Sequence, residues 1–163
     1  MENLNLKMLF LILVVFVAIF IGGCVSKIET GITYNEPAGW EKFTFGGMIT
    51  YQHPSDSDTF IQFIPETEKE KDFRIDDWEE NIRIDQENCD RLKVVKIDNF
   101  TVNNLQASEY IGECELGGKI LMTRYVVIVK DNQYALFTLA TTKKDYDKNN
   151  AIFNKVLNSI VWK

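Results

Sequence analysis

Three cysteines and a single histidine are the residues through which this 163-residue chain could do chemistry. Cys24 ends an apolar run over residues 8–23 and stands directly after two glycines, in Ile21-Gly22-Gly23-Cys24. A short segment with Lys7, an apolar run and small residues before a cysteine are typical of an export signal. In bacterial-type signals of this kind the cysteine takes lipid on its sulfur. The pattern therefore predicts a signal peptide over residues 1–23, lipidation of Cys24, and a mature protein on the extracytoplasmic face of the membrane.

Two other structures for the apolar run stay open. A helix that crosses a bilayer core needs about 20 apolar residues, and the run over residues 8–23 is shorter than that. Leu4 and Leu6 could extend it into an uncleaved anchor, which would leave the domain in the same location. The other alternative is a helix buried in a protein core.

Cys89 and Cys114 remain as a pair, and disulfides persist in exported proteins. If Asn103-Asn104 closes a two-residue hairpin, Cys114 pairs with Lys93, which follows Cys89 by only four residues. That chain length lets the two cysteines approach within the distance that a disulfide requires. The sequence therefore predicts a Cys89–Cys114 disulfide. The alternative is that both thiols are small buried hydrophobic residues.

His53 is the only imidazole, which excludes a metal site built from several histidines. Together with Asp56 and Asp58 it could form a loose divalent-cation site. However, Asp and Ser are also the ordinary residues of a turn, and we favour that interpretation. A cysteine nucleophile paired with His53 would lack any activating motif. We therefore expect no catalytic, cofactor-binding or metal-binding residue.

Composition limits the partners of the domain. The chain carries 18 Lys and Arg against 24 Asp and Glu, a net charge of −6, and no stripe of basic residues that would neutralise phosphates. Nucleic acid is therefore not an expected partner. Anionic lipid would repel such a domain mildly, so membrane contact is expected through the anchor on Cys24. Asn99-Phe100-Thr101 is a candidate acceptor for N-glycosylation at Asn99.

The first elements after the signal are short. Residues 24–32 show no periodic pattern and are interpreted as a tether, so that residues 33–163 form one domain. Segments 49–53 and 59–65 are rich in β-branched and aromatic residues. Because a polar turn sequence over residues 54–58 separates them, they predict a hairpin.

A charged stretch over residues 66–72 predicts an exposed loop, and a helix is predicted to begin after it. In Asp76-Asp-Trp-Glu79 a side-chain acceptor is followed three residues later by a glutamate, which is a capping pattern. Apolar residues then recur at helical spacing and are expected to face the core: Ile75, Trp78, Ile82 and Cys89.

Residues 92–142 repeat one pattern, a strand-like segment followed by a two-residue turn. The turns, at Asn103-Asn104, Gly117-Gly118 and Asp131-Asn132, tolerate the positive φ of tight hairpins. A four-stranded antiparallel meander is predicted. Residues 126–129 and 135–139 are mostly apolar on both faces, so both sides of the sheet should be covered. This favours a layered α+β structure over an open barrel.

A closing helix is predicted over residues 145–159, with Asp145 or Asp147 as its cap. Its apolar stripe consists of Phe153, Val156, Leu157 and Ile160. Val161 and Trp162 are expected to complete the core.

The order of these features resembles the PsbP-like family, especially its small archaeal and bacterial lipoproteins. The motifs that carry the likeness are Tyr34-x-x-Pro37-x-Gly39-Trp40, Ile49-Thr-Tyr51, Asp76-Asp-Trp-Glu79, Thr101-Val-Asn-Asn-Leu-Gln-Ala107 and Leu157-Asn-Ser-Ile160. The resemblance spans residues 33–163. It implies a central antiparallel sheet of about six strands with helices on its faces. Extrinsic oxygen-evolving subunits of photosystem II and a Ran-binding import factor share that fold. Asn104 stands where the turn has glycine, and asparagine tolerates the left-handed conformation.

The family does not share one chemistry, and a fold does not imply a function. The resemblance thus supplies no catalytic residue. Together with the export signal, it predicts a lipid-anchored, extracytoplasmic and non-enzymatic domain that binds a protein of the cell envelope. The alternative is a solute-binding receptor or an enzyme. A deep pocket with converging titratable groups would favour that alternative, and a flat face with exposed aromatic residues would favour the binding domain.

Overall fold

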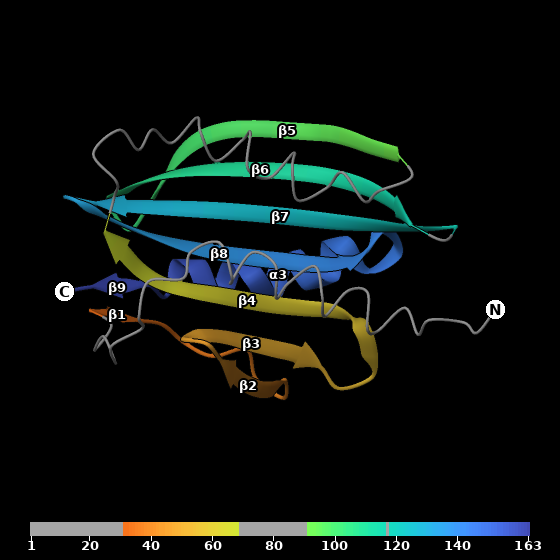
Figure 1. Ribbon diagram of the computed structural model, residues 1–163, viewed down its shortest axis with the longest axis horizontal. Coiled ribbons are helices and arrows are strands. Elements are labelled where there is room, and N and C mark those ends of the chain that lie inside the picture. Colours follow the sequence, from red (N-terminus) through yellow and green to blue (C-terminus); the bar gives the residue numbers. More distant parts are fainter. Residues whose placement is uncertain (1–30, 69–90, 117) are drawn as a thin grey trace.

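The computed structural model describes residues 31–68, 91–116 and 118–163, which form a large antiparallel sheet, a two-stranded ribbon and one long helix (Figure 1). The sheet has seven strands in the order β2-β3-β4-β8-β7-β6-β5. These are β2 (Glu41–Phe45), β3 (Met48–His53), β4 (Asp56–Glu68), β5 (Arg91–Val102), β6 (Leu105–Leu116), β7 (Lys119–Lys130) and β8 (Gln133–Thr142). The ribbon pairs β1 (Ile32–Thr33) with β9 (Val161–Trp162). The helical segments are η1 (Lys143–Asp145) and α3 (Tyr146–Asn158).

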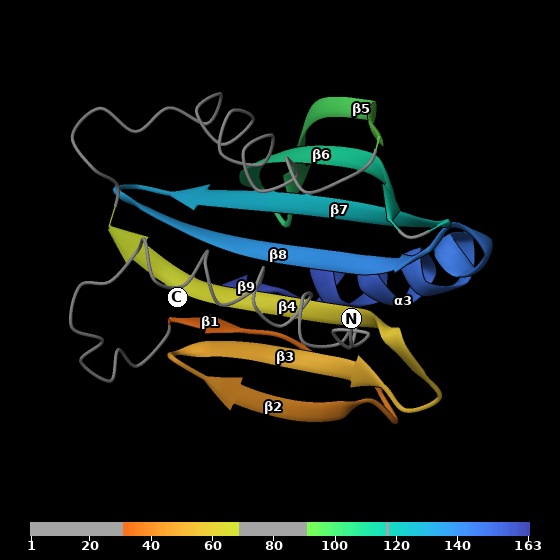
Figure 2. The ribbon, with the colours of Figure 1, turned by 45° about the vertical axis from the view of Figure 1, so that its right-hand side comes forward.

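Helix α3 lies across one face of the sheet, which we call the α3 face (Figures 1 and 2). Because strand residues alternate between faces, every second residue of the strands beneath it faces the helix, and many of these residues form the main core. Three residues predicted to form the apolar stripe of the helix, Phe153, Val156 and Leu157, are buried in this core. The core also includes Tyr51, Ile61, Phe63, Val126, Ile128, Phe137, Leu139, Ile160 and Trp162. The α+β class predicted from the sequence is confirmed.

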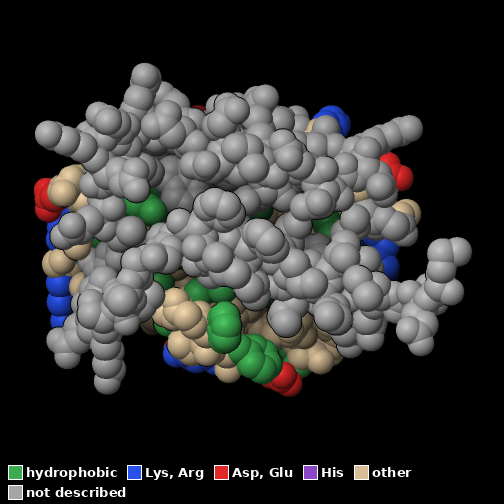
Figure 3. Space-filling model, viewed as in Figure 1, with side chains coloured by type: hydrophobic (Ala, Val, Ile, Leu, Met, Phe, Trp, Pro, Cys, Tyr) green, Lys and Arg blue, Asp and Glu red, His purple; other side chains and the backbone are tan. Residues whose placement is uncertain are grey.

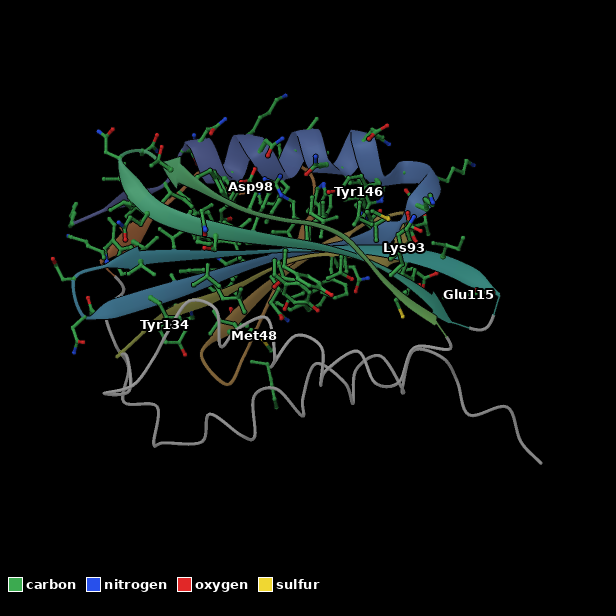
Figure 4. The ribbon with its side chains drawn as sticks, turned by 90° about the horizontal axis from the view of Figure 1, so that it is seen from above. Met48, Lys93, Asp98, Glu115, Tyr134 and Tyr146 are labelled. Atoms are coloured by element: carbon green, nitrogen blue, oxygen red, sulfur yellow. The ribbon has the colours of Figure 1, made fainter. Side chains whose placement is uncertain are left out.

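The opposite face of the sheet is apolar as well. It carries a second buried cluster formed by Val127, Tyr134 and Leu136. Figure 4 shows Tyr134 and Met48 on the side away from α3, and Tyr146 between α3 and the sheet. Both faces of β7 and β8 are therefore buried, as the sequence predicted. The helix predicted to begin at Asp76, with Trp78, lies outside the described residues.

The predicted four-stranded meander is confirmed as β5 to β8. Two-residue turns connect its strands, so that the last residue of each strand pairs with the first residue of the next: Val102 with Leu105, Leu116 with Lys119, and Lys130 with Gln133. In the first turn Asn103 and Asn104 have φ of 49° and 68°, the left-handed conformation that asparagine tolerates. The amide of Asn103 also donates to the carbonyls of Asn158 (3.0 Å) and Ile160 (2.7 Å). This turn therefore binds the end of α3 as well as reversing the chain.

The register of β5 differs from the prediction. It follows the expected pairing from Val102 to Lys96, where Lys96 pairs with Ile111, and then shifts by one residue. Val95 is the extra residue of a β-bulge, so Cys114 pairs with Leu92 and not with Lys93. A bulge of this kind leaves no signature in an alternating sequence.

The hairpin predicted from residues 49–53 and 59–65, which is formed by β3 and β4, also departs from prediction. Its turn is Pro54-Ser55 and not the whole of residues 54–58, because β4 already begins at Asp56. The side chain of Asp56 accepts bonds from the Asp58 N–H (3.0 Å) and the Thr59 hydroxyl (2.7 Å) and so stabilises the tight connection. Strand β4 then extends to Glu68, into the stretch predicted to be a charged loop.

The C-terminal region contains two corrections. Asp145 occupies the N-cap position of α3, but its side chain makes no capping bond and accepts the Thr142 hydroxyl instead (3.1 Å). Trp162 reaches the main core as expected, whereas Val161 is 54% exposed because it points outward from the β1–β9 ribbon. Within the described ranges, no helix combines the length and apolarity needed to span a membrane.

Candidate protein-binding surface

The β2–β3 hairpin forms the surface at one edge of the sheet. Gly46 and Gly47 have φ of 57° and 83° and connect Phe45 directly to its partner Met48. Two successive residues at positive φ make the turn whose twist matches that of antiparallel strands, and glycine adopts it without steric cost. The sequence Phe-Thr-Phe-Gly-Gly therefore folds locally into a strand and its turn.

Two phenylalanines on β2 are exposed. Phe43 is 51% and Phe45 is 66% exposed, and their i, i+2 spacing places both on the face away from α3. Figure 3 shows hydrophobic side chains at the molecular surface over this hairpin, at the lower edge of the view. Contiguous exposed apolar patches mark interaction sites, whereas single scattered apolar residues are normal at a protein surface. We call Phe43, Phe45 and the adjoining Glu41 the β2 patch.

Aromatic packing on the α3 face holds the hairpin in place. Tyr51 of β3 is 1% exposed, and its hydroxyl lies 3.0 Å from that of Tyr34. The Tyr34 ring makes edge contacts with Tyr51, Phe63 and Phe137 at centroid distances of 6.3, 5.1 and 5.6 Å. The segment between β1 and β2 is thus packed against the sheet, and this packing fixes the position at which β2 begins.

An ion pair between Glu36 and Lys42 ties β2 to the same segment. The hydrogen bond from Lys42 lowers the pKa of the Glu36 carboxyl, and the Lys42 ammonium lies 5.7 Å from the centre of the Tyr51 ring. Lys42 therefore points toward the α3 face. The aromatic side chains of the β2 patch lie on the other face, so no cation of β2 lies beside them.

Alkaline pH should weaken the Tyr34–Tyr51 contact. Burial raises the pKa of both phenols above the value of about 10 that an unfolded tyrosine has. The neutral phenols stabilise the fold fully below about pH 10, and this stabilisation is lost as pH rises further. We expect the thermal unfolding midpoint of the wild type to fall above pH 10, and that of Tyr51→Phe to fall less. Equal losses in both proteins would assign the alkaline transition to another group.

The residues considered for metal binding make other contacts. His53 packs edge-on against Trp40 with centroids 5.3 Å apart, and its Nδ1 accepts the Ser55 N–H. Asp56 binds Thr59, and Asp58 pairs with Lys119 at 2.7 Å. Across the described parts of the chain, no group of three His, Cys, Asp or Glu side chains is placed to hold a metal ion.

Cys114 lies on β6, paired with Leu92 and Leu121, on the face away from α3. Cys89 and Cys24 lie outside the described residues, so the Cys89–Cys114 disulfide and the lipidation of Cys24 stay predictions. Asn99 is exposed on β5, and its side-chain oxygen accepts a hydrogen bond from Ser108. Its glycosylation also stays a prediction.

A buried charged cluster between the sheet and α3 was not predicted from the sequence. Arg124 and Glu109 form an ion pair at 2.7 Å, with side chains only 10% and 6% exposed. Arg124 also donates to the side-chain oxygens of Asn150 (2.7 Å) and Asn154 (2.6 Å) on α3, and it lies over the Phe153 ring. A signal was present, because both charges interrupt segments predicted to be strands. The contacts join the sheet to the helix and are structural.

Comparison with known proteins places the fold. No family model matches the sequence, and no curated protein does. Among solved structures, cyanobacterial PsbP (CyanoP) from Synechocystis superposes with a TM-score of 0.66 at 13% identity, covering 87% of this chain and 97% of that one. LpqN of Mycobacterium tuberculosis gives 0.55 at 13% identity, with coverages of 80% and 82%. The yeast Ran-binding protein Mog1p gives 0.59 at 8% identity, with coverages of 85% and 93%. The PsbP-like fold implied by the sequence motifs is confirmed.

Proposed function

We propose that this chain is a lipid-anchored, extracytoplasmic protein whose PsbP-like domain binds another protein of the cell envelope through the β2 patch. The observation that carries the proposal is the exposure of Phe43 and Phe45 on an edge strand. Aromatic side chains are enriched at protein interfaces because they bury a large area with few rotatable bonds. A flat surface with exposed aromatic residues is the feature that distinguishes a binding domain from an enzyme or solute receptor.

Two similar structures support a role in binding and a connection with the cell envelope. Mog1p is a Ran-binding protein, so this fold presents protein-binding surfaces in at least one case. LpqN is involved in cell envelope biogenesis. The acidic net charge of −6 is consistent with a protein partner and disfavours nucleic acid.

Removing the two phenylalanines tests the binding surface. We expect Phe43→Ser with Phe45→Ser to reduce the amount of partner recovered with the full-length protein from its native membrane at least about tenfold, since a central aromatic anchor contributes 2 kcal/mol or more. Recovery is measured by quantitative mass spectrometry against wild-type protein.

Ile120→Ser is the matched control, because Ile120 is 42% exposed on β7, away from the β2 patch. It should leave recovery unchanged. Folding of all variants is checked by thermal unfolding, where exposed substitutions should change stability by only about 0.5 kcal/mol. Equal recovery with the double variant and wild type would overturn the proposed binding surface.

The anchor has its own test. Cys24 supplies the only thiol in the lipidation motif, so Cys24→Ser should yield unprocessed or released protein without lipid mass. Intact mass and membrane fractionation from native cells measure this. If Cys24→Ser stays on the membrane and its mass differs from that of the wild type only by the substitution, the apolar run is instead an uncleaved helical anchor.

A further inference from the structure

The two edges of the sheet differ in how open they are to another strand. Exposed edges invite pairing with other chains, and proteins usually close them with bulges, prolines or lysines. The β5 edge contains the bulge at Val95 and an exposed lysine, Lys93. Strand β2 pairs with β3 without interruption from Glu41 to Phe45 and has no proline. Among the described residues, no strand pairs with the outer side of β2.

The one cation of β2 does not guard this edge. Lys42 is bound by Glu36 and held over the Tyr51 ring, which draws its ammonium across β3 on the α3 face. A gatekeeping lysine must instead leave its charge beside the edge, where an added strand would have to desolvate it. Because Glu36 already pairs with the Lys42 charge, the approach of a strand to β2 costs less electrostatic free energy than it would beside an unpaired lysine.

We propose that the partner inserts an extended segment antiparallel to β2, as an eighth strand of the sheet. The inference rests on the proposed function and specifies how the β2 patch binds. Main-chain hydrogen bonds supply the pairing, and alternate side chains supply the selectivity. On the face away from α3, β2 presents Glu41, Phe43 and Phe45. The complementary segment has two apolar residues opposite the phenylalanines and a lysine or arginine opposite Glu41.

A second copy of this chain is a poorer occupant. Antiparallel pairing of two β2 strands keeps their α3 faces on the same side, because paired residues share a face. Glu41 would then meet only Glu41, Phe43 or Phe45 of the other copy, none of which is a cation. Each copy also carries a net charge of −6. The charge pattern therefore favours a different protein with a basic residue at this position.

A synthetic peptide tests the mode of binding on the full-length protein in detergent micelles. The probe is acetyl-Ile-Thr-Val-Thr-Arg-amide with a fluorescent label, which in an antiparallel arrangement places Ile, Val and Arg opposite Phe45, Phe43 and Glu41. N-methylation of alternate residues removes the N–H groups of one side of the peptide at a time. If the peptide pairs with β2, methylation of the N–H groups that face β2 should weaken its binding at least about tenfold. Methylation of the N–H groups on the other side should leave the affinity within about twofold of that of the parent peptide.

Charge reversal tests the predicted side-chain pairing. Glu41→Lys should weaken binding of the arginine peptide by about threefold and strengthen a peptide with Glu in place of Arg by a similar factor. Asp147→Lys on α3 is the matched control, because Asp147 is exposed and the charge change is the same. It should leave both affinities unchanged. Deuterium exchange should slow in β2 when the arginine peptide binds.

Several outcomes would overturn the added strand. Equal losses for both N-methylated sets would show side-chain docking without strand pairing and would leave the proposed function standing. No binding at about 1 mM peptide would show that the edge does not accept this pattern. If the peptide fails to bind and the wild type forms a dimer in sedimentation that is lost in Phe43→Ser, the edge binds a second copy. If the peptide fails to bind and the wild type binds anionic vesicles but Phe43→Ser does not, the edge binds lipid. Partner recovery that is independent of Phe43 and Phe45 would overturn the proposed function itself.

Discussion

Arg124→Met is expected to destabilise the fold by about 3–5 kcal/mol, because it leaves the carboxylate of Glu109 buried without its cation. The Glu109 side chain is only 6% exposed, so water cannot replace the guanidinium. The substitution also removes the donor to Asn150 and Asn154 and so loosens the contact between α3 and the sheet. Urea unfolding of the variant should show a lower midpoint at an unchanged slope.

A double substitution separates the charge effect from packing. Arg124→Met with Glu109→Leu removes both buried charges and should regain most of the lost stability, since a well-packed apolar pair often matches a buried ion pair. Arg124→Lys keeps the charge but not the planar fork that reaches several acceptors, and an intermediate loss is expected. If the double variant is no more stable than Arg124→Met, the loss comes from packing and not from an unpaired carboxylate.

Phe137→Ala is expected to cost about 3–5 kcal/mol, because it opens a cavity in the centre of the main core. Phe137 has no exposed surface, and its ring stacks on Phe63 with centroids 4.5 Å apart. Its ring also meets Tyr34 at 5.6 Å, so the cavity would reach the segment that fixes the β2–β3 hairpin. We therefore expect partner binding through the β2 patch to weaken together with stability.

Phe43→Ala is the matched control for that substitution. The same side chain is removed, but Phe43 is 51% exposed, so stability should change by only about 0.5 kcal/mol. Thermal unfolding of both variants measures the difference. A large loss for Phe43→Ala would mean that its ring is buried by another part of the chain and is not available to a partner.

Local patterns predicted much of the fold. The Asn103-Asn104 turn, the strands β5 to β8 and the apolar stripe of α3 lie at the predicted positions, although the register of β5 shifts at Val95. These features depend on backbone preferences and on periodicity within a few residues of one another, which a sequence displays directly. Strand β2 was missed although Gly46-Gly47 after Phe43 and Phe45 is a hairpin signal. The sheet therefore has seven strands where about six were expected.

Contacts between distant segments required the tertiary structure. The sequence could not show that Val95 forms a bulge, because a bulge depends on how two strands meet and not on either strand alone. Nor could it pair Glu109 with Arg124, since their approach depends on the β6–β7 register and on the position of α3.

The candidate site divides in the same way. The sequence by itself carries the predicted export signal that ends at Cys24, the acidic charge and the residue types of β2, because these follow from composition and neighbouring residues. Only the tertiary structure decided that β2 is an edge strand, that Phe43 and Phe45 stay exposed, and that Lys42 is drawn to the α3 face by Glu36. Exposure is a property of what the rest of the chain leaves uncovered, so local sequence does not encode it.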